Sequence, residues 1–208
     1  METLKILSVD FDYIMYPCIK LYNTYVSESE SQTVIWEQLE QLLEIDKYLC
    51  YDADALKRIT QLILTNVNNH AIFIPVENHE EIVDILKKDK NYPSSKFDIV
   101  NIDFHHDMYY REEDIAEILD FKRYNCSDWL GYLYFTKKLE RCRWLKAPNS
   151  DPYNGKAEIE ILGKKDFDSI KNDFNIVFLC LSPQWVPYKY HHLYELLCSI
   201  FKEVCKQL

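Results

Sequence analysis

The chain has 208 residues, which fits one α/β domain over residues 1–208 better than two domains. Its hydrophobic content of 48% is typical of an ordinary packed core, whereas its net charge of −10 argues against a nucleic-acid partner, because acidic surfaces repel phosphates. It contains only 3 glycines and neither GxGxxG nor GxxxxGK[ST], which excludes the usual glycine-rich phosphate loops.

Short apolar runs alternate with amphipathic stretches along the chain. Residues 4–9, rich in Ile, Leu and Val, are predicted to form the first buried strand. Further strands are predicted at residues 70–75, 97–104, 141–147, 157–162 and 175–181, of which 141–147 and 157–162 are expected at the edge of the sheet. Helices are predicted at residues 33–46, 54–66 (with Asp52 or Asp54 as cap), 77–89, 112–121, 127–139 and 190–207. This alternation predicts a three-layer α/β/α fold with a mainly parallel sheet.

The densest group of candidate ligands follows the strand at 97–104. Asp103, His105 and Asp107 alternate there, so their side chains can project in the same direction. Two carboxylates and an imidazole suit a divalent metal ion. The alternative is a polar turn with helix-capping acids, but delivering three ionisable groups from a buried strand to one place is costly without a cation. His106 directly follows His105, so its side chain is expected to point away from the metal ligands. The alternative is that His106 acts as a proton shuttle.

Two more strand ends carry candidate ligands. Asp10 and Asp12 follow the first strand, and His79 begins the helix after the strand at 70–75. Taken alone, the acids could be turn residues and the histidine a helix-start or surface residue. Because ligand sites lie outside the carboxyl ends of parallel strands, we expect these residues to meet the first group. The predicted metal ligands are Asp10, Asp12, His79, Asp103, His105 and Asp107.

Six nitrogen and oxygen ligands are enough for two divalent ions that share bridging carboxylates. Mn²⁺ is the natural candidate, ahead of Mg²⁺, Fe²⁺ and Zn²⁺, and the lack of cysteine in the set argues against a structural zinc site. The reaction class predicted from the residues is metal-assisted hydrolysis.

Candidate substrate-binding residues lie after the metal-ligand segments. Asn125, Asp128 and Trp129 are expected to line the substrate entrance; the alternative is an ordinary helix N-terminus with Ser127 as its cap. Ser182 ends the apolar strand at 175–181 and is expected to face the same crevice, the alternative being a proline-stopped strand with a packed tryptophan. The pair at 191–192, two histidines at a helix start, is expected on the surface.

The segment Asp103-Phe104-His105-His106-Asp107 resembles the DxHxD signature of the arginase and ureohydrolase superfamily. His79 lies near the place of that family's first metal-binding histidine, and Asp10-Phe11-Asp12 resembles its second acidic pair. With the Val-Glu-Asn-His-Glu sequence around His79 and the segment 125–130, the chain looks most like the small atypical branch that contains peptide arginases. These enzymes convert arginine to ornithine within ribosomally made peptides.

The resemblance implies an arginase- and deacetylase-like fold and a role for each ligand. Asp10 and Asp103 would bridge two metal ions, His79 and Asp107 would complete one site, and His105 and Asp12 would complete the other. Asp107 would also be the catalytic residue that holds the proton of the attacking water. The implied substrate is an arginine-containing peptide or a small guanidino compound. In ordinary arginases the acidic pair follows the DxHxD segment, whereas here it precedes it, so a rearranged strand order is predicted.

Three other functions fit parts of the sequence. A haloacid-dehalogenase-type phosphatase would use Asp10 as nucleophile with Asp12, although Ile14 departs from its usual pattern. A single-zinc deacetylase of the same superfamily shares the Asp-x-His-His pattern, but the glycines that normally follow are missing. The third is an acidic interaction module with a vestigial site.

The expected location is cytoplasmic. Seven cysteines occur without a CxxC pair, which is typical of reduced, buried thiols. The first residues lack the basic region and cleavage site of a signal peptide, and no apolar run approaches about 18 residues, so no membrane span is expected.

Overall fold

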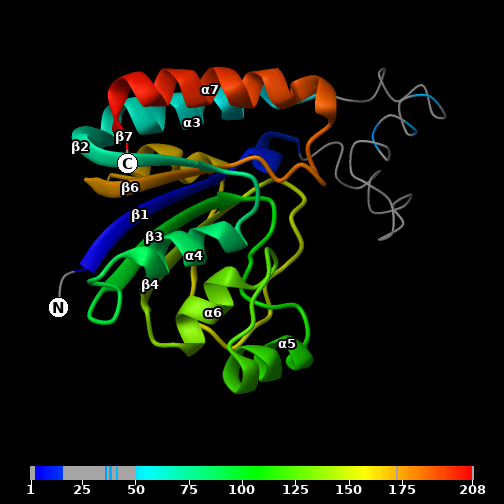
Figure 1. Ribbon diagram of the computed structural model, residues 1–208. Helices are drawn as coiled ribbons and strands as arrows, with labels where there is room; N and C mark the ends of the chain where they lie inside the picture. Colours follow the sequence, from blue (N-terminus) through cyan, green and yellow to red (C-terminus); the bar gives the residue numbers. More distant parts are fainter. Residues whose placement is uncertain are drawn as a thin grey trace.

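Seven parallel strands form the centre of the computed structural model, which describes residues 3–15, 36, 38, 41, 50–171 and 173–207 (Figure 1). The strand order is β5-β4-β3-β1-β6-β2-β7, and every pair of neighbours is parallel. The strands are β1 (Thr3–Asp10), β2 (Val67–Val76), β3 (Lys96–Asp103), β4 (Leu139–Lys146), β5 (Glu160–Leu162), β6 (Phe174–Cys180) and β7 (Lys206–Gln207).

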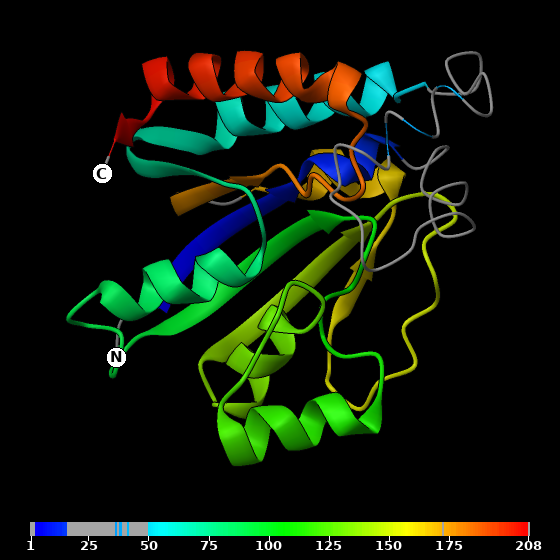
Figure 2. The ribbon, with the colours of Figure 1, turned by 45° about the vertical axis from the view of Figure 1, so that its right-hand side comes forward.

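Helices cover both faces of this sheet, which confirms the predicted three-layer α/β/α arrangement (Figures 1 and 2). One face carries α3 (Ala53–Asn66) and α7 (His191–Val204), and the other carries α4 (Glu80–Lys88), α5 (Glu112–Ala116) and α6 (Trp129–Phe135). The remaining helical turns are η1 (Phe11–Met15), η3 (Glu117–Phe121), η4 (Lys164–Ser169) and η5 (Tyr188–Tyr190). We call the two sides the α3–α7 face and the α4–α6 face.

Alternation along the strands divides the core between these faces. Leu7 and Val9 of β1 pack in the core that includes Ile63 of α3 and Phe201 of α7, whereas Ile6 packs in the core that includes Ile82 of α4. Successive side chains of a strand point to opposite faces, so both faces of β1 are apolar, as a central parallel strand requires.

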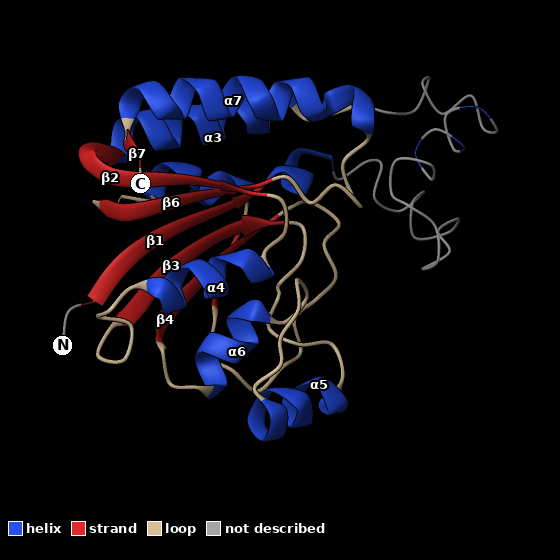
Figure 3. Cartoon of the chain, viewed as in Figure 1, coloured by secondary structure: helices blue, strands red, loops and turns tan. Residues whose placement is uncertain are grey.

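The connections after β1 and β3 leave the sheet on opposite faces. From β1 the chain continues through η1 toward α3, whereas from β3 it continues toward α5 and α6 on the other face (Figure 3). Adjacent parallel strands whose connections diverge in this way leave a crevice at their carboxyl ends, which is where such sheets bind ligands.

The elements differ from the prediction most clearly in β4, α6, α7 and α5. β4 lies inside the sheet between β3 and β5, so only β5 forms that edge. The helix predicted over 127–139 ends at Phe135, because Lys137 adopts a left-handed conformation with φ 60° and redirects the chain into β4. The predicted helix 190–207 ends at Val204, and β7 follows and pairs with β2. The predicted helix 112–121 divides into α5 and a π-helical turn, η3.

Other predicted features can be placed directly. Asp52 is the N-cap of α3, and its side chain accepts a hydrogen bond from the Ala55 backbone N–H at 3.0 Å. The helix predicted over 33–46 falls outside the described residues except at Trp36, Gln38 and Gln41. Among the described residues, no helix has both the length and the apolar character needed to cross a bilayer.

Candidate metal centre

Strand register brings two of the predicted ligands side by side. Val9 of β1 pairs with Ile102 of β3, so Asp10 and Asp103, the next residue of each strand, end at the same level of the sheet. Every second side chain of a strand points to the same face. Asp10 and Asp103 alternate in this way with residues that pack on the α4–α6 face, so their side chains project to that face. The carboxyl ends of the two central strands therefore deliver two buried carboxylates to one place.

The first ligand group surrounds His79, which lies in the turn between β2 and α4. Its Nδ1 atom is 2.8 Å from Asp107 Oδ2, 3.5 Å from Asp10 Oδ2 and 3.6 Å from Asp103 Oδ2. Each of these four side chains is at most 3% exposed. We call this set the inner group.

The second group surrounds His105, just beyond β3. His105 Nδ1 is 2.9 Å from Asp12 Oδ2 and 3.8 Å from Asp103 Oδ1. The His105 side chain is 21% exposed, whereas Asp12 and Asp103 are fully buried, so this outer group faces solvent through its histidine. Asp103 belongs to both groups, because Oδ2 faces His79 and Oδ1 faces His105. A carboxylate that bridges two metal ions presents its oxygens in this way.

Hydrogen bonds from surrounding side chains fix the carboxylates. Ser182 Oγ donates to Asp10 Oδ2 at 2.6 Å, and Trp129 Nε1 donates to Asp107 Oδ2 at 2.8 Å. Asn101 Nδ2 donates to Asp103 Oδ2 at 3.0 Å. Such supporting donors orient ligands and make a metal site rigid.

The α6 helix holds the loop that carries Asp107. Asp107 has a left-handed backbone conformation with φ 51°, and its carbonyl oxygen accepts hydrogen bonds from the backbone N–H groups of Leu130 and Gly131 at 3.0 and 3.2 Å. A Cβ atom at Gly131 would lie 1.7 Å from the Met108 carbonyl oxygen. Only glycine allows the helix to approach this closely, and that approach positions Asp107.

The candidate substrate-binding residues divide into two pairs. Trp129 and Ser182 are buried, and their polar atoms contact Asp107 and Asp10, so the geometry favours a positioning role for both. Asn125 is exposed, whereas Asp128 is buried and accepts hydrogen bonds from the Asn125 backbone N–H at 2.7 Å and from Asn125 Nδ2 at 3.2 Å. Asp128, rather than Ser127, is the N-cap residue of α6.

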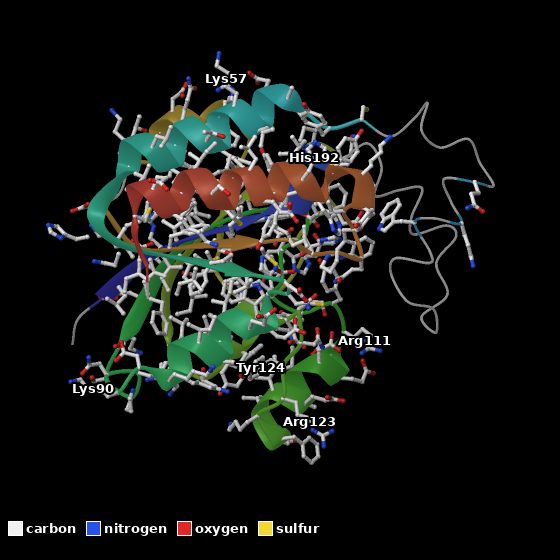
Figure 4. All side chains as sticks on the ribbon, turned by 45° about the horizontal axis from the view of Figure 1, so that its top comes forward. Lys57, Lys90, Arg111, Arg123, Tyr124 and His192 are labelled. Carbon is white, nitrogen blue, oxygen red and sulfur yellow. The ribbon has the colours of Figure 1, made fainter. Side chains whose placement is uncertain are left out.

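Asn125 and Asp128 line an open cavity of about 440 Å³ on the surface. Its other lining residues are Glu80, Asp84, Glu117, Arg123 and Tyr124, and Figure 4 labels Arg123 and Tyr124 beside α5. Burial raises the pKa of Asp128 to about 6. This cavity is mainly acidic and lies next to, rather than within, the two ligand groups.

The remaining histidines lie away from the ligand groups. The His106 ring stacks on Tyr110 at 4.2 Å between centroids, and its Nδ1 accepts a hydrogen bond from the Met108 backbone N–H at 3.2 Å. Burial lowers the pKa of His106, which keeps the ring neutral. His191 Nε2 is 3.1 Å from the Val186 carbonyl oxygen, and His192 is exposed on α7 (Figure 4).

Two residues near the ligands were not predicted. Asn101 is a buried amide inside an apolar strand, two residues before Asp103 and on the same face of the strand. A polar residue at that position could have been recognised in the sequence as a partner of Asp103. Cys180 ends β6 as the register partner of Asp10, and its Sγ atom forms a set with ligand atoms of Asp10 and His79 in which all separations are within 4.8 Å. The predicted ligand set contains no cysteine, and the structure places the Cys180 thiol beside two of its members. Its apolar neighbours led to its interpretation as an ordinary core thiol.

Crowding of buried carboxylates dominates the electrostatics. Burial and the charge of Asp12 raise the pKa of Asp10 to about 7, and burial together with the charges of Asp107 and Asp12 raises the pKa of Asp103 well above its ordinary value. Burial acts to raise the pKa of Asp107 as well, but the charge of His79 and hydrogen bonds from it outweigh burial, and that pKa is lowered. The metal-free centre thus retains protons that divalent cations would replace.

The donor chemistry fits divalent metal ions. Among the described residues, ligand-type atoms cluster in three sets: Asp10 with His79 and Cys180, Asp12 with Asp103 and His105, and His79 with Asp103 and Asp107. All six predicted ligands lie in these sets. Comparisons of the chain with protein-family models, with curated proteins and with solved structures each found no match. The likeness of the DxHxD segment to arginases therefore stays a prediction.

Proposed function

We propose that this protein is a binuclear-metal hydrolase that hydrolyses the guanidinium group of arginine, within a peptide, to ornithine and urea. The observation that carries the proposal is the Asp103 carboxylate, which faces His79 with Oδ2 and His105 with Oδ1. A structural ion pair would need only one of these histidines, whereas a bridging ligand needs a donor group on each side.

The two ligand groups correspond to two metal positions. His79 and Asp107 would complete the inner position, and His105 and Asp12 the outer one, with Asp10 and Asp103 shared. Two divalent ions, most naturally Mn²⁺, would make a bound water acidic enough to react near neutral pH. The protein would contribute the fixed orientation of the carboxylates, through Ser182, Trp129 and Asn101.

Asp107 is the proposed proton acceptor, in the role that the resemblance to arginases implies. Its carboxylate accepts a hydrogen bond from Trp129 Nε1, lies 2.8 Å from His79 Nδ1 and has a lowered pKa, so it is ionised at neutral pH. In the proposed reaction the water oxygen bonds to the guanidinium carbon while Asp107 accepts one of the two water protons. The bond between that carbon and the ornithine nitrogen then breaks, the nitrogen takes both water protons and leaves as an ammonium group, and urea is released.

The outer group supplies a suitable approach for a guanidinium ion. His105 is its partly exposed member, and the Trp185 ring lies 4.8 Å from the His105 ring, between centroids. Arginine side chains stack on aromatic faces and are attracted by carboxylates. The partial exposure of His105 beside an aromatic ring and buried carboxylates supports an arginine side chain as the substrate.

The phosphatase alternative is less compatible with the geometry. Asp10 is only 2% exposed, and both of its oxygens accept hydrogen bonds, from the Asp12 backbone N–H at 2.9 Å and from Ser182 Oγ at 2.6 Å. A nucleophilic carboxylate needs one accessible oxygen. The deacetylase alternative differs in stoichiometry, because it requires one zinc ion rather than two metal ions.

The test combines metal analysis with mass spectrometry. The purified protein, loaded with Mn²⁺, should hold two ions per chain and should convert arginine in test peptides with loss of CN₂H₂ per residue. Asp103→Asn should abolish conversion and reduce metal content, whereas Asp168→Asn, at a side chain that is 92% exposed, should leave both unchanged. Two bound ions without conversion of peptide-borne or free arginine would refute guanidinium hydrolysis. Failure to bind any divalent ion would refute the metal centre and favour the interaction module.

A further inference from the structure

Cys180 occupies the strand position next to Asp10. The two residues are register partners at the carboxyl ends of β6 and β1, and paired residues of parallel strands project to the same face. Cys180 Sγ is 3.4 Å from Ser182 Oγ, and the same hydroxyl donates to Asp10 Oδ2. The thiol therefore borders the inner group directly.

The His79 ring supplies a second observation. Its Nδ1 atom faces three carboxylates, whereas its Nε2 atom is buried and has no hydrogen-bond partner in the described part of the chain. Buried polar atoms are nearly always satisfied, so an unpartnered nitrogen on a ring that forms a ligand set with Asp10 and Cys180 points to a missing ligand. His79 itself is 2% exposed, which leaves no route for bulk water to satisfy that atom.

The spacing of this set suits one ion. Ligand atoms of Asp10, His79 and Cys180 all lie within 4.8 Å of one another. With zinc-to-sulfur and zinc-to-nitrogen bonds of about 2.3 and 2.1 Å, the ligand atoms of a tetrahedral ion lie roughly 3.6 Å apart. Shifts of up to about 1 Å would therefore bring all three to one ion.

We propose that Cys180 is a metal ligand, which together with Asp10 and His79 forms a thiol-containing seat for one divalent ion at the inner end of the metal centre. The proposal rests on the metal centre of the proposed function, but not on its substrate. Thiolate ligands favour zinc and other borderline or soft ions over Mn²⁺, whereas the Asp12, Asp103 and His105 set offers only oxygen and nitrogen. An ion at this seat would then differ chemically from one held by that set.

Binding at this seat releases a proton. The thiol S–H bond breaks, its proton passes to solvent and the sulfur lone pair binds the ion, with no change in oxidation state. A variant without the thiol should therefore release one proton fewer when it is loaded with the ion.

Cobalt titration of the full-length metal-free protein tests the proposal. Co²⁺ bound by a thiolate gives a sulfur-to-cobalt charge-transfer band in the near ultraviolet, which oxygen and nitrogen ligands do not give. The band should appear in the wild type and in Cys142→Ser, a control at a buried cysteine of β4 outside all three ligand sets. It should be lost in Cys180→Ser, which should also bind Zn²⁺ at least about tenfold more weakly, since even outer partners of metal ligands typically contribute that much.

Absence of the band from cobalt-loaded wild type, or its persistence in Cys180→Ser, would overturn the proposal. X-ray absorption of the zinc-loaded wild type gives an answer that does not depend on the folding of a variant. A sulfur neighbour at about 2.3 Å from zinc is expected, and a shell of only nitrogen and oxygen at about 2.0–2.2 Å would overturn the assignment. Because neither readout involves hydrolysis, a protein with the sulfur signal but no action on arginine peptides would refute the substrate and retain the ligand.

Discussion

Trp129 offers a sharp test of how the metal centre is supported. The side chain is fully buried, its Nε1 donates to Asp107 Oδ2 at 2.8 Å, and its ring lies 5.4 Å from the His79 ring. Trp129→Phe keeps an aromatic ring beside His79 but removes the donor to the carboxylate. A hydrogen bond to a charged group contributes about 1.5–3 kcal/mol, and about 1.4 kcal/mol corresponds to a tenfold change in affinity. Affinity for the inner ion should therefore fall by roughly 10–100-fold.

Trp144 provides a matched control for this substitution. It is 1% exposed, and its Nε1 donates at 3.0 Å to the backbone carbonyl oxygen of Asp103 rather than to a ligand carboxylate. Trp144→Phe should lose comparable packing and one neutral hydrogen bond, which lowers the free energy of unfolding by about 1–3 kcal/mol without a similar loss of metal affinity.

Isothermal titration of the metal-free proteins with Mn²⁺ and Zn²⁺, alongside urea unfolding, separates the two effects. Trp129→Phe should lose both stability and affinity, and Trp144→Phe mainly stability. If Trp129→Phe binds both ions as tightly as the wild type, then the indole does not position Asp107 for metal binding, and the supporting role assigned to it is refuted.

Two further outcomes follow from the charge and the packing of the centre. Because the folded-state pKa of Asp10 is raised to about 7, its stabilising contribution to the metal-free protein is present below about pH 4 and is lost as the pH rises through 7. An ion replaces that proton, so the rise in melting temperature on adding Mn²⁺ should be larger at pH 8 than at pH 6; an equal rise would contradict a raised pKa. Gly131→Ala should destabilise the fold by about 3 kcal/mol or more, because the new Cβ would lie 1.7 Å from the Met108 carbonyl oxygen. In Gly163→Ala the nearest atom is Asp166 Oδ2 at 3.8 Å, so urea unfolding of that control should shift by much less, and equal shifts would refute the packing argument.

The central strands and their ligands could be predicted because both strands show the same local sequence pattern. Residues 4–9 and 97–104 are apolar runs that end in alternating acids, and parallel strands end at a common edge. Asp10 and Asp103 therefore had to lie near one another once β1 and β3 were neighbours. That adjacency follows from long-range packing, and the sequence supported it only through the general rule that ligand residues meet at the carboxyl ends of parallel strands.

The supporting contacts could not be predicted for a different reason. Trp129 and Ser182 follow the ligand segments at positions that suit a substrate entrance, and only the fold determines that their polar atoms meet Asp107 and Asp10. Cys180 was hidden by its apolar strand, since buried free cysteines usually behave as small hydrophobic residues. β7 has two residues, too few to show the alternation of apolar and polar side chains by which a strand is recognised.

The hydrogen bond between Ser182 and Asp10 joins positions 172 residues apart in the chain. Histidine and carboxylate ligands from residues 79 to 107 lie beside the same carboxylate, so no short stretch of the protein contains the whole centre. During synthesis the first ligands leave the ribosome long before the serine that orients them. Metal ions are thus expected to enter a nearly finished protein, and their loss should weaken the attachment between its earliest and latest strands.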